Sequence, residues 1–257
     1  MRLVAMLLAV GALLGASPVI AEDLRDAFVL VAKQRLADTR MADAPAGPGT
    51  RSAQGPRLYR QVVDSVVLVV TKDAIGTGVV VSPKGHILTN WHVTEGNEVV
   101  GVVPRNRDLL KGIQALRREN VSMAHVVASD ARRDLALLSV TPLPPGLKPA
   151  SLGKPGGVEV GQDVYSIGHP QGLLWSYAEG VVSQIRPDYE WAYLDGSKHQ
   201  ATILQTQTPM HPGSSGGALF DGTSQVVGII YGGKEASLGF AIAVTEVYDW
   251  IQSLVRK

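Results

Sequence analysis

The sequence predicts an all-β fold, a barrel or a sandwich, that ends in a helix. From residue 58 onwards, short apolar runs rich in Val, Ile and Leu are separated by Gly, Pro and Asp, a pattern typical of strands joined by turns. Residues 244–257 instead have helical spacing, and their apolar side chains share one face: Val247, Trp250, Ile251 and Leu254. We therefore expect β-structure with one helix docked against it.

The predicted strands are short and follow one another along the chain. Examples are residues 65–71, 78–82, 87–89, 135–140, 163–167, 203–205 and 226–231. With 257 residues, of which 45% are hydrophobic, the chain can build one sizeable domain or a compact pair of barrels. Residues 105–120 interrupt the series with mixed charges. We expect a solvated amphipathic excursion there, and a substrate-guiding or partner-binding loop is the alternative.

The first 21 residues resemble a secretory signal peptide. Arg2 precedes an apolar run over residues 3–14, and small residues follow up to Ala21. A run of 12 residues is shorter than the roughly 20 that a membrane-spanning helix needs, so we expect cleavage after Ala21, with Ala16 as the fallback. The mature protein is thus predicted to begin near Glu22, to be periplasmic or secreted, and to have no membrane span.

Residues 22–57 are predicted to form a helix and a linker ahead of the main domain, which spans residues 58–257. Residues 22–40 have a loose apolar face, whereas residues 41–57 are rich in Ala, Pro and Gly. We expect a tail or tether here and not a second domain.

Composition restricts the possible partners. Removal of residues 1–21 takes away only one basic residue, Arg2, so 23 basic and 23 acidic residues remain and the formal charge is zero. This balance argues against nucleic acid as the main partner. The chain has no cysteine, so the exported protein is expected to do without disulfides. No histidine spacing such as H-E-x-x-H indicates a metal site, and no cofactor is expected. The sequence predicts no particular oligomeric state.

Two short segments carry the chemistry of a nucleophilic triad. TNWHV, residues 89–93, ends an apolar strand with His92, and PGSSGG, residues 212–217, places Ser215 among glycines. A serine hydroxyl is a poor nucleophile until an imidazole takes its proton, and the imidazole needs a carboxylate to fix its tautomer. Gly213 can adopt backbone angles that turn the Gly213 and Ser215 amides towards an oxyanion.

Asp134 is the predicted triad acid. It directly precedes the apolar run of residues 135–138, as expected for an acid buried behind a histidine, while Asp130 lies in the polar turn before it and is the alternative. The order histidine, acid, serine excludes the α/β-hydrolase elbow, which needs the histidine after the serine. The last histidine of the chain, His211, precedes Ser215.

In this order the segments resemble the trypsin-like serine proteases of the bacterial HtrA/Deg type. Residues 76–93 resemble that family's histidine block, residues 134–138 its aspartate block, residues 161–183 its second-barrel strands and residues 205–218 its serine block. The resemblance runs from about residue 58 to about residue 250. It implies a chymotrypsin-like fold of two six-stranded antiparallel β-barrels with a C-terminal helix.

The resemblance also implies the roles of the site residues. It assigns the nucleophile to Ser215 and not to Ser214, with His92 as the base, Asp134 as the orienting acid, and the amides of Gly213 and Ser215 as oxyanion donors. Ser214 stands where digestive proteases carry an aspartate that pairs with a new N-terminus, so activation by zymogen clipping is not expected. Because the chain ends directly after the closing helix, no PDZ domain is expected either.

The specificity pocket is predicted from the same resemblance. In this fold the residue six positions before the serine, Pro209, sets the base of the pocket. Ile230, Tyr231 and Gly232 are expected to form one wall. No acid occurs in residues 208–214, so a buried Lys or Arg of a substrate would lack an ionic partner. We expect cleavage after small or medium apolar residues.

Three functions stay open at this point. The first is an exported serine endopeptidase that hydrolyses unfolded or misfolded polypeptides through an acyl-enzyme. The second is a binding or chaperone-like protein with the protease fold, whose active site is malformed until it is activated. The third is an esterase with the same triad. Fluorophosphonate labelling separates the first two, and a comparison of casein with short acyl esters separates the third.

Overall fold

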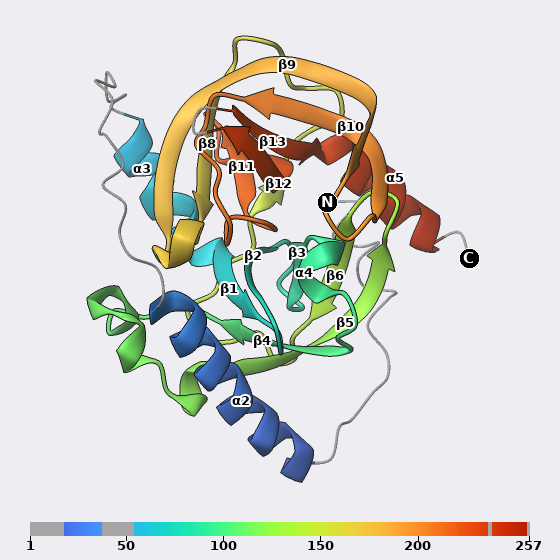
Figure 1. Cartoon of the computed structure of the whole chain (residues 1–257). Helices are drawn as coiled ribbons and strands as arrows, with labels where there is room; N and C mark the ends of the chain where they lie inside the picture. The colour runs from blue at the N-terminus through green and yellow to red at the C-terminus, as the bar shows by residue number, and fades with distance from the viewer. Residues whose placement is uncertain (1–17, 38–53, 236–237, 256–257) are drawn as a thin grey trace.

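The structure confirms the predicted all-β fold, because two β-barrels make up most of the molecule (Figure 1). The computed structural model describes residues 18–37, 54–235 and 238–255. The first barrel is closed and antiparallel, with the strand order β1-β2-β3-β6-β5-β4. Its strands are β1 (Val66–Val70), β2 (Ile75–Val80), β3 (His86–Thr89), β4 (Val99–Val103), β5 (Ser122–Asp130) and β6 (Leu135–Ser139).

The second barrel also closes, with one additional strand. The order β11-β8-β9-β10-β13-β12 returns to its start because β11 pairs with β12. Its strands are β8 (Asp163–Gly168), β9 (Ser176–Ala192), β10 (Lys198–Thr206), β11 (Ala218–Asp221), β12 (Gln225–Glu235) and β13 (Leu238–Ala243). Strand β7 (Ser151–Leu152) adds to β12 in parallel, so the sheet departs from the expected six antiparallel strands by this short edge.

Each barrel has its own apolar interior. One buried cluster takes side chains from all six strands of the first barrel: Val67, Val80, Ile87, Val100, Ala124 and Leu138. A second takes side chains from all six strands of the second barrel: Val164, Val182, Leu204, Leu219, Ile230 and Ala241. Each of these compact clusters takes side chains from every strand of one ring, as is typical of the interior of a small barrel.

The outer face of the first barrel is buried as well. Val66, Leu68 and Val70 of β1 belong to a third cluster, together with Phe28 from the N-terminal segment and Tyr165 from β8. Because both faces of β1 are covered, the strand is a continuous apolar run and does not alternate between apolar and polar residues.

The closing helix lies where the sequence predicts it. Helix α5 (Val244–Val255) follows β13 directly and buries Val247, Trp250 and Ile251. Two further helices are short: α3 (Gly55–Val62) ahead of β1, and α4 (Trp91–Thr94) after β3. One-turn 3₁₀ helices are η1 (Val63–Ser65), η2 (Leu109–Lys111), η3 (Ile113–Ala115), η4 (Arg118–Asn120) and η5 (Pro170–Gly172).

The N-terminal segment is docked against the first barrel, and this differs from the expected tail. Helix α2 (Pro18–Ala37) runs along the barrel beneath β4 in Figure 1 and fully buries Phe28 and Ala32. The Phe28 ring fills the space above Gly101 of β4, where no side chain stands. Residues 41–53 of the predicted linker and residues 1–17 of the predicted signal peptide lie outside the described residues, whereas residues 55–57 of the predicted linker belong to helix α3.

Residues 105–120, between the histidine and aspartate blocks, also pack against α2. The three 3₁₀ turns of this segment bury Leu109 and Leu116 in the same cluster as Phe28, and Arg118 lies 4.0 Å from Asp26 of α2. The charged residues of this segment therefore face the solvent, and its buried leucines pack against the barrel and α2. In the described parts of the chain, no helix is both long and apolar enough to cross a membrane.

The docking of α2 predicts that Phe28→Ala destabilises the protein. Loss of a fully buried phenylalanine from a packed interface costs about 3–5 kcal/mol of unfolding free energy. Leu30→Ala is the matched control, because Leu30 lies on the same helix with 57% of its surface exposed, and it should stay close to the wild type. Urea unfolding followed by tryptophan fluorescence measures both. Equal midpoints for the two variants would contradict the docking.

Candidate active site

His92 lies at the rim of the first barrel. It belongs to the single turn of α4, which follows β3 directly and lies beside β6 in Figure 1. Its Nδ1 is 2.8 Å from Asp134 Oδ2 and 3.1 Å from Asp134 Oδ1. A carboxylate only accepts hydrogen bonds, so Nδ1 carries the proton and Nε2 of the neutral ring keeps its lone pair.

Asp134 is fully buried in the turn before β6, and several donors converge on it. Besides the imidazole, the His92 backbone N–H donates to Oδ1 at 2.9 Å and the Tyr193 hydroxyl donates to Oδ2 at 2.8 Å. The Asn90 amide holds the Asp134 backbone by donating to its carbonyl at 2.9 Å. A buried charge is costly unless it is paired, and these donors supply that pairing.

The alternative acid, Asp130, lies away from the imidazole. Its carboxylate accepts from the Arg133 guanidinium at 2.7 Å and from the Arg133 backbone N–H at 3.0 Å. Arg133 also donates to Glu246 of α5 at 2.8 Å, so these acids are engaged in ion pairs. Among the described residues, no group of three or more acidic or histidine side chains is arranged to hold a metal ion.

Ser215 comes from the second barrel, in the turn between β10 and β11. The Thr77 N–H of β2 donates to the Ser215 carbonyl at 2.7 Å, which ties this turn to the first barrel. Gly216 has φ of +83°, and a side chain there would collide with the Thr77 carbonyl. Ser215 is partly exposed, and its hydroxyl donates to the Tyr231 carbonyl at 3.4 Å. Within the described residues, this hydroxyl makes no hydrogen bond to His92.

The peptide before Gly213 has a defined orientation. The Gln171 N–H donates to the Pro212 carbonyl at 2.7 Å, and a trans peptide points its C=O and N–H in opposite directions. The Gly213 N–H therefore points away from Gln171. Within the described part of the chain, the amides of Gly213 and Ser215 donate to no protein acceptor, and both residues are partly exposed. These two donors are free to meet a substrate oxygen.

A buried histidine supports the same turn from below. The Thr77 hydroxyl donates to the Gly213 carbonyl at 2.7 Å and lies 2.9 Å from His169 Nδ1. Because the single hydroxyl proton is used on the carbonyl, His169 Nδ1–H must be the donor to Thr77. His169 packs edge-on against Trp175, and burial lowers its pKa to about 3. His169 is thus a neutral structural donor beneath the serine turn.

The residues predicted for the specificity pocket differ in their exposure and packing. Pro209 is exposed, and the neighbouring Met210 is buried instead. The Met210 sulfur and carbonyl take up the space left by the missing side chains of Gly239 and Gly233. On the expected wall, Ile230 belongs to the apolar interior of the barrel, and the Tyr231 ring stacks on the Trp191 ring at a centroid distance of 4.4 Å. Gly232 borders open space, so of these three residues only Gly232 leaves room beside the strand.

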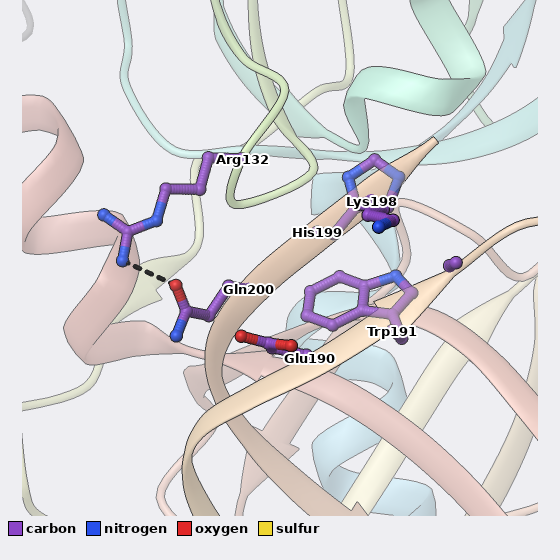
Figure 2. Close-up of a pocket in the computed structure, with 7 residues that line it drawn as sticks. Arg132, Glu190, Trp191, Lys198, His199 and Gln200 are labelled. Carbon is purple, nitrogen blue, oxygen red and sulfur yellow. Dashed lines mark hydrogen bonds between the residues drawn. The ribbon is translucent and has the colours of Figure 1, made fainter. Parts of the chain in front are cut away.

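An aromatic layer follows the β9–β10 hairpin towards His92. Trp191 stacks on Tyr231 and on His199, at centroid distances of 4.4 and 5.4 Å. Tyr193 lies 4.8 Å from the His92 ring. Figure 2 shows Trp191 and His199 at an open cavity of about 630 Å³, whose other lining residues are Arg132, Glu190, Ala192, Lys198 and Gln200. None of the candidate triad side chains lines this cavity.

Sequence reasoning missed two contributors to the site. Thr77 lies within the GTG of the histidine block, so its place between two glycines was an available signal. No sequence signal indicated Tyr193. It follows strand β9, far along the chain from Asp134, and only the folded β9–β10 hairpin brings Tyr193 and Asp134 together.

Comparisons with known proteins identify the family of this chain. The family profile described as trypsin-like peptidase domain matches residues 76–229. The chain belongs to the trypsin-like peptidase family. Among its relatives is Protease Do-like 1, chloroplastic, of Arabidopsis thaliana, which is 32% identical over 220 residues covering 78% of this chain and 47% of the relative.

Other members of the family confirm the resemblance to HtrA/Deg-type proteases. The probable periplasmic serine endoprotease DegP-like of Pseudomonas savastanoi pv. phaseolicola is 32% identical over 68% of this chain and 34% of its own length. The chain thus spans less than half of these relatives. Among solved structures, the HtrA-type protease AlgW with tripeptide has a TM-score of 0.63 at 27% identity, covering 78% of this chain and 63% of that one. The inactive form of the Rv3671c protease has a TM-score of 0.64 at 26% identity, and the match covers 81% of this chain and 97% of that protease chain.

His169 predicts a pH dependence of the stability of this trypsin-like peptidase. The ordinary imidazole pKa is 6.5 and that of folded His169 is about 3, so the unfolded chain binds the extra proton as the pH falls. The stabilisation is complete above pH 6.5 and is lost towards pH 3. Between about pH 7 and about pH 4.5, the wild type should lose roughly 2 kcal/mol more unfolding free energy than His169→Asn. The free energy of unfolding of both proteins is measured in urea as a function of pH. If the two pH curves are parallel, His169 is not a neutral buried donor in the folded protein.

Proposed function

We propose that this chain is an exported serine endopeptidase that hydrolyses peptide bonds with His92, Asp134 and Ser215. The observation that carries the proposal is the buried Asp134 carboxylate on the Nδ1 side of His92, with a partly exposed serine held across the barrel interface. Asp134 fixes the tautomer that leaves His92 Nε2 free to accept a proton, which is the requirement for activating Ser215.

The proposed reaction passes through an acyl-enzyme. The Ser215 oxygen forms a bond to the scissile carbonyl carbon as its proton moves to His92 Nε2. The tetrahedral intermediate collapses by breaking the C–N bond, and the amine leaves with the proton from Nε2. Water then repeats the attack, gives its proton to His92, and releases the carboxylic acid while Ser215 recovers its proton.

The Gly213 and Ser215 amides are the proposed oxyanion donors. The Gln171–Pro212 bond supports the orientation of the Gly213 N–H, and within the described residues neither the Gly213 nor the Ser215 N–H donates to a protein acceptor. Each such donor contributes about 100- to 1000-fold in rate in related chemistry.

Export and the substrate class belong to the same proposal. The predicted signal peptide and the periplasmic name of a DegP-like relative support a mature enzyme that begins near Glu22 and acts in the periplasm or outside the cell. We propose unfolded or misfolded polypeptides as substrates.

One observation favours a second candidate, a protease-fold binding protein whose proteolysis is low until it is activated. The Ser215 hydroxyl bonds to the Tyr231 carbonyl, which leaves the serine–histidine contact unmade. If a fluorophosphonate labels the wild-type protein without any added peptide, and at a rate that added peptide does not change, this candidate is rejected.

The triad predicts that Ser215→Ala and His92→Ala abolish casein cleavage while the fold stays intact. Members of a triad act as a unit, so each loss should lower kcat by about 10⁴- to 10⁶-fold. Asp134→Asn should cost about 10⁴-fold, whereas Asp130→Asn, the matched control, should leave the chemistry intact. Casein cleavage by Ser215→Ala at the wild-type rate would refute the proposal, and a crippled Asp130→Asn beside an active Asp134→Asn would reassign the acid.

Met210 predicts the cleavage specificity. Its buried side chain packs against Gly239 and Gly233, and we propose that it limits the depth of the specificity pocket, so the enzyme should cut after small or medium apolar residues such as Val, Ala, Ile or Leu. Met210→Ala should then extend cleavage to larger side chains such as Phe. Mass-spectrometric mapping of cut sites in unfolded casein tests both. A dominant preference for Lys or Arg would overturn the pocket assignment and leave the triad untouched.

A further inference from the structure

Tyr193 lies where the second barrel reaches over to the triad acid. It is the first residue after β9, in the turn that leads to β10. Its hydroxyl donates to Asp134 Oδ2 at 2.8 Å, and its ring packs against His92 at a centroid distance of 4.8 Å. His92 and Asp134 both belong to the first barrel, so Tyr193 contacts the pair from the opposite side of the barrel interface.

The β9–β10 hairpin is anchored to the turn that carries Asp134. The His199 ring lies 2.6 Å from the Ala131 carbonyl through Nδ1, which must be the protonated nitrogen because a carbonyl only accepts. The Gln200 N–H donates to the Arg132 carbonyl at 2.7 Å, and the Arg132 guanidinium returns a bond to the Gln200 side chain at 2.9 Å, as Figure 2 shows. Three bonds therefore fix the hairpin to residues 131–132, just ahead of the acid.

The hydroxyl of Tyr193 is suited to a permanent donor role. Burial, together with the neighbouring Asp134 charge, raises the pKa of Tyr193 well above its ordinary value. The hydroxyl therefore keeps its proton at every pH at which a protease would be assayed. The tip of the hairpin is turned outwards, since Leu194 is fully exposed, whereas the Tyr193 hydroxyl points back to the acid.

We propose that Tyr193 is a positioning residue of the catalytic apparatus, which holds the Asp134 carboxylate in the orientation that His92 requires and makes triad geometry depend on the docked β9–β10 hairpin. The inference rests on the proposed protease function. Without the hydroxyl, Asp134 Oδ2 loses one of its donors inside a buried site, and the carboxylate can turn away from the imidazole. Tyr193 touches no reacting atom in this role.

The test compares Tyr193→Phe with the wild type on fluorescently labelled casein. The ring and its packing on His92 remain, so we expect kcat to fall by about 10-fold or more while KM stays near the wild-type value. Tyr177→Phe is the matched control, because the Tyr177 hydroxyl also donates to a carboxylate, Glu179, at 3.1 Å on the same strand. That variant should keep the wild-type kcat.

A double-mutant cycle identifies the route of the effect. If Tyr193 acts through Asp134, Tyr193→Phe should not slow fluorophosphonate labelling further in an Asp134→Asn background. An equal loss in both backgrounds, an unchanged kcat, or a change in KM alone would each overturn the inference. An inactive and unlabelled wild type would instead reject the protease function, and the inference would fall with it.

Discussion

The buried carboxylate of Asp134 is the interaction on which the site depends. An unpaired charge at this depth would be costly, so the surrounding donors are a condition for placing it there. Those donors come from both barrels: His92 supplies its ring and backbone N–H, and Tyr193 supplies its hydroxyl. In the proposed mechanism this acid orients the imidazole, so the docking of the two barrels, through the Tyr193 hydrogen bond, contributes to the proposed chemistry.

A second connection between the barrels holds the serine turn. Thr77 of the first barrel donates its backbone N–H to the Ser215 carbonyl and its hydroxyl to the Gly213 carbonyl. His169 completes the support from the second barrel. Glycine at position 216 permits this close approach, because any side chain would strike Thr77. The acid side and the serine side of the site are thus each stabilised across the same interface.

The sequence predicted strands at the positions of β1, β2, β3, β6, β8, β10 and β12, together with the closing helix and the order of the blocks, because these follow from local patterns and short motifs. It also brought His92 and Asp134 into one hypothesis, and the structure places their side chains in contact. Tyr193 was out of reach, since a tyrosine after a long strand has no signature until the hairpin folds over the first barrel. The docking of α2 was not predicted for a related reason. Phe28 is buried because its ring occupies the space beside Gly101 of β4, and the pattern of residues within the helix gives no sign of that contact.

The most direct measurement is the site of covalent labelling by a fluorophosphonate on the purified protein, located by tandem mass spectrometry. The account predicts one adduct, on Ser215, formed by the wild type and absent from His92→Ala, because only the activated serine attacks phosphorus. An adduct on Ser214, or one that forms equally fast without His92, would contradict the claim that the Asp134–His92 pair activates Ser215.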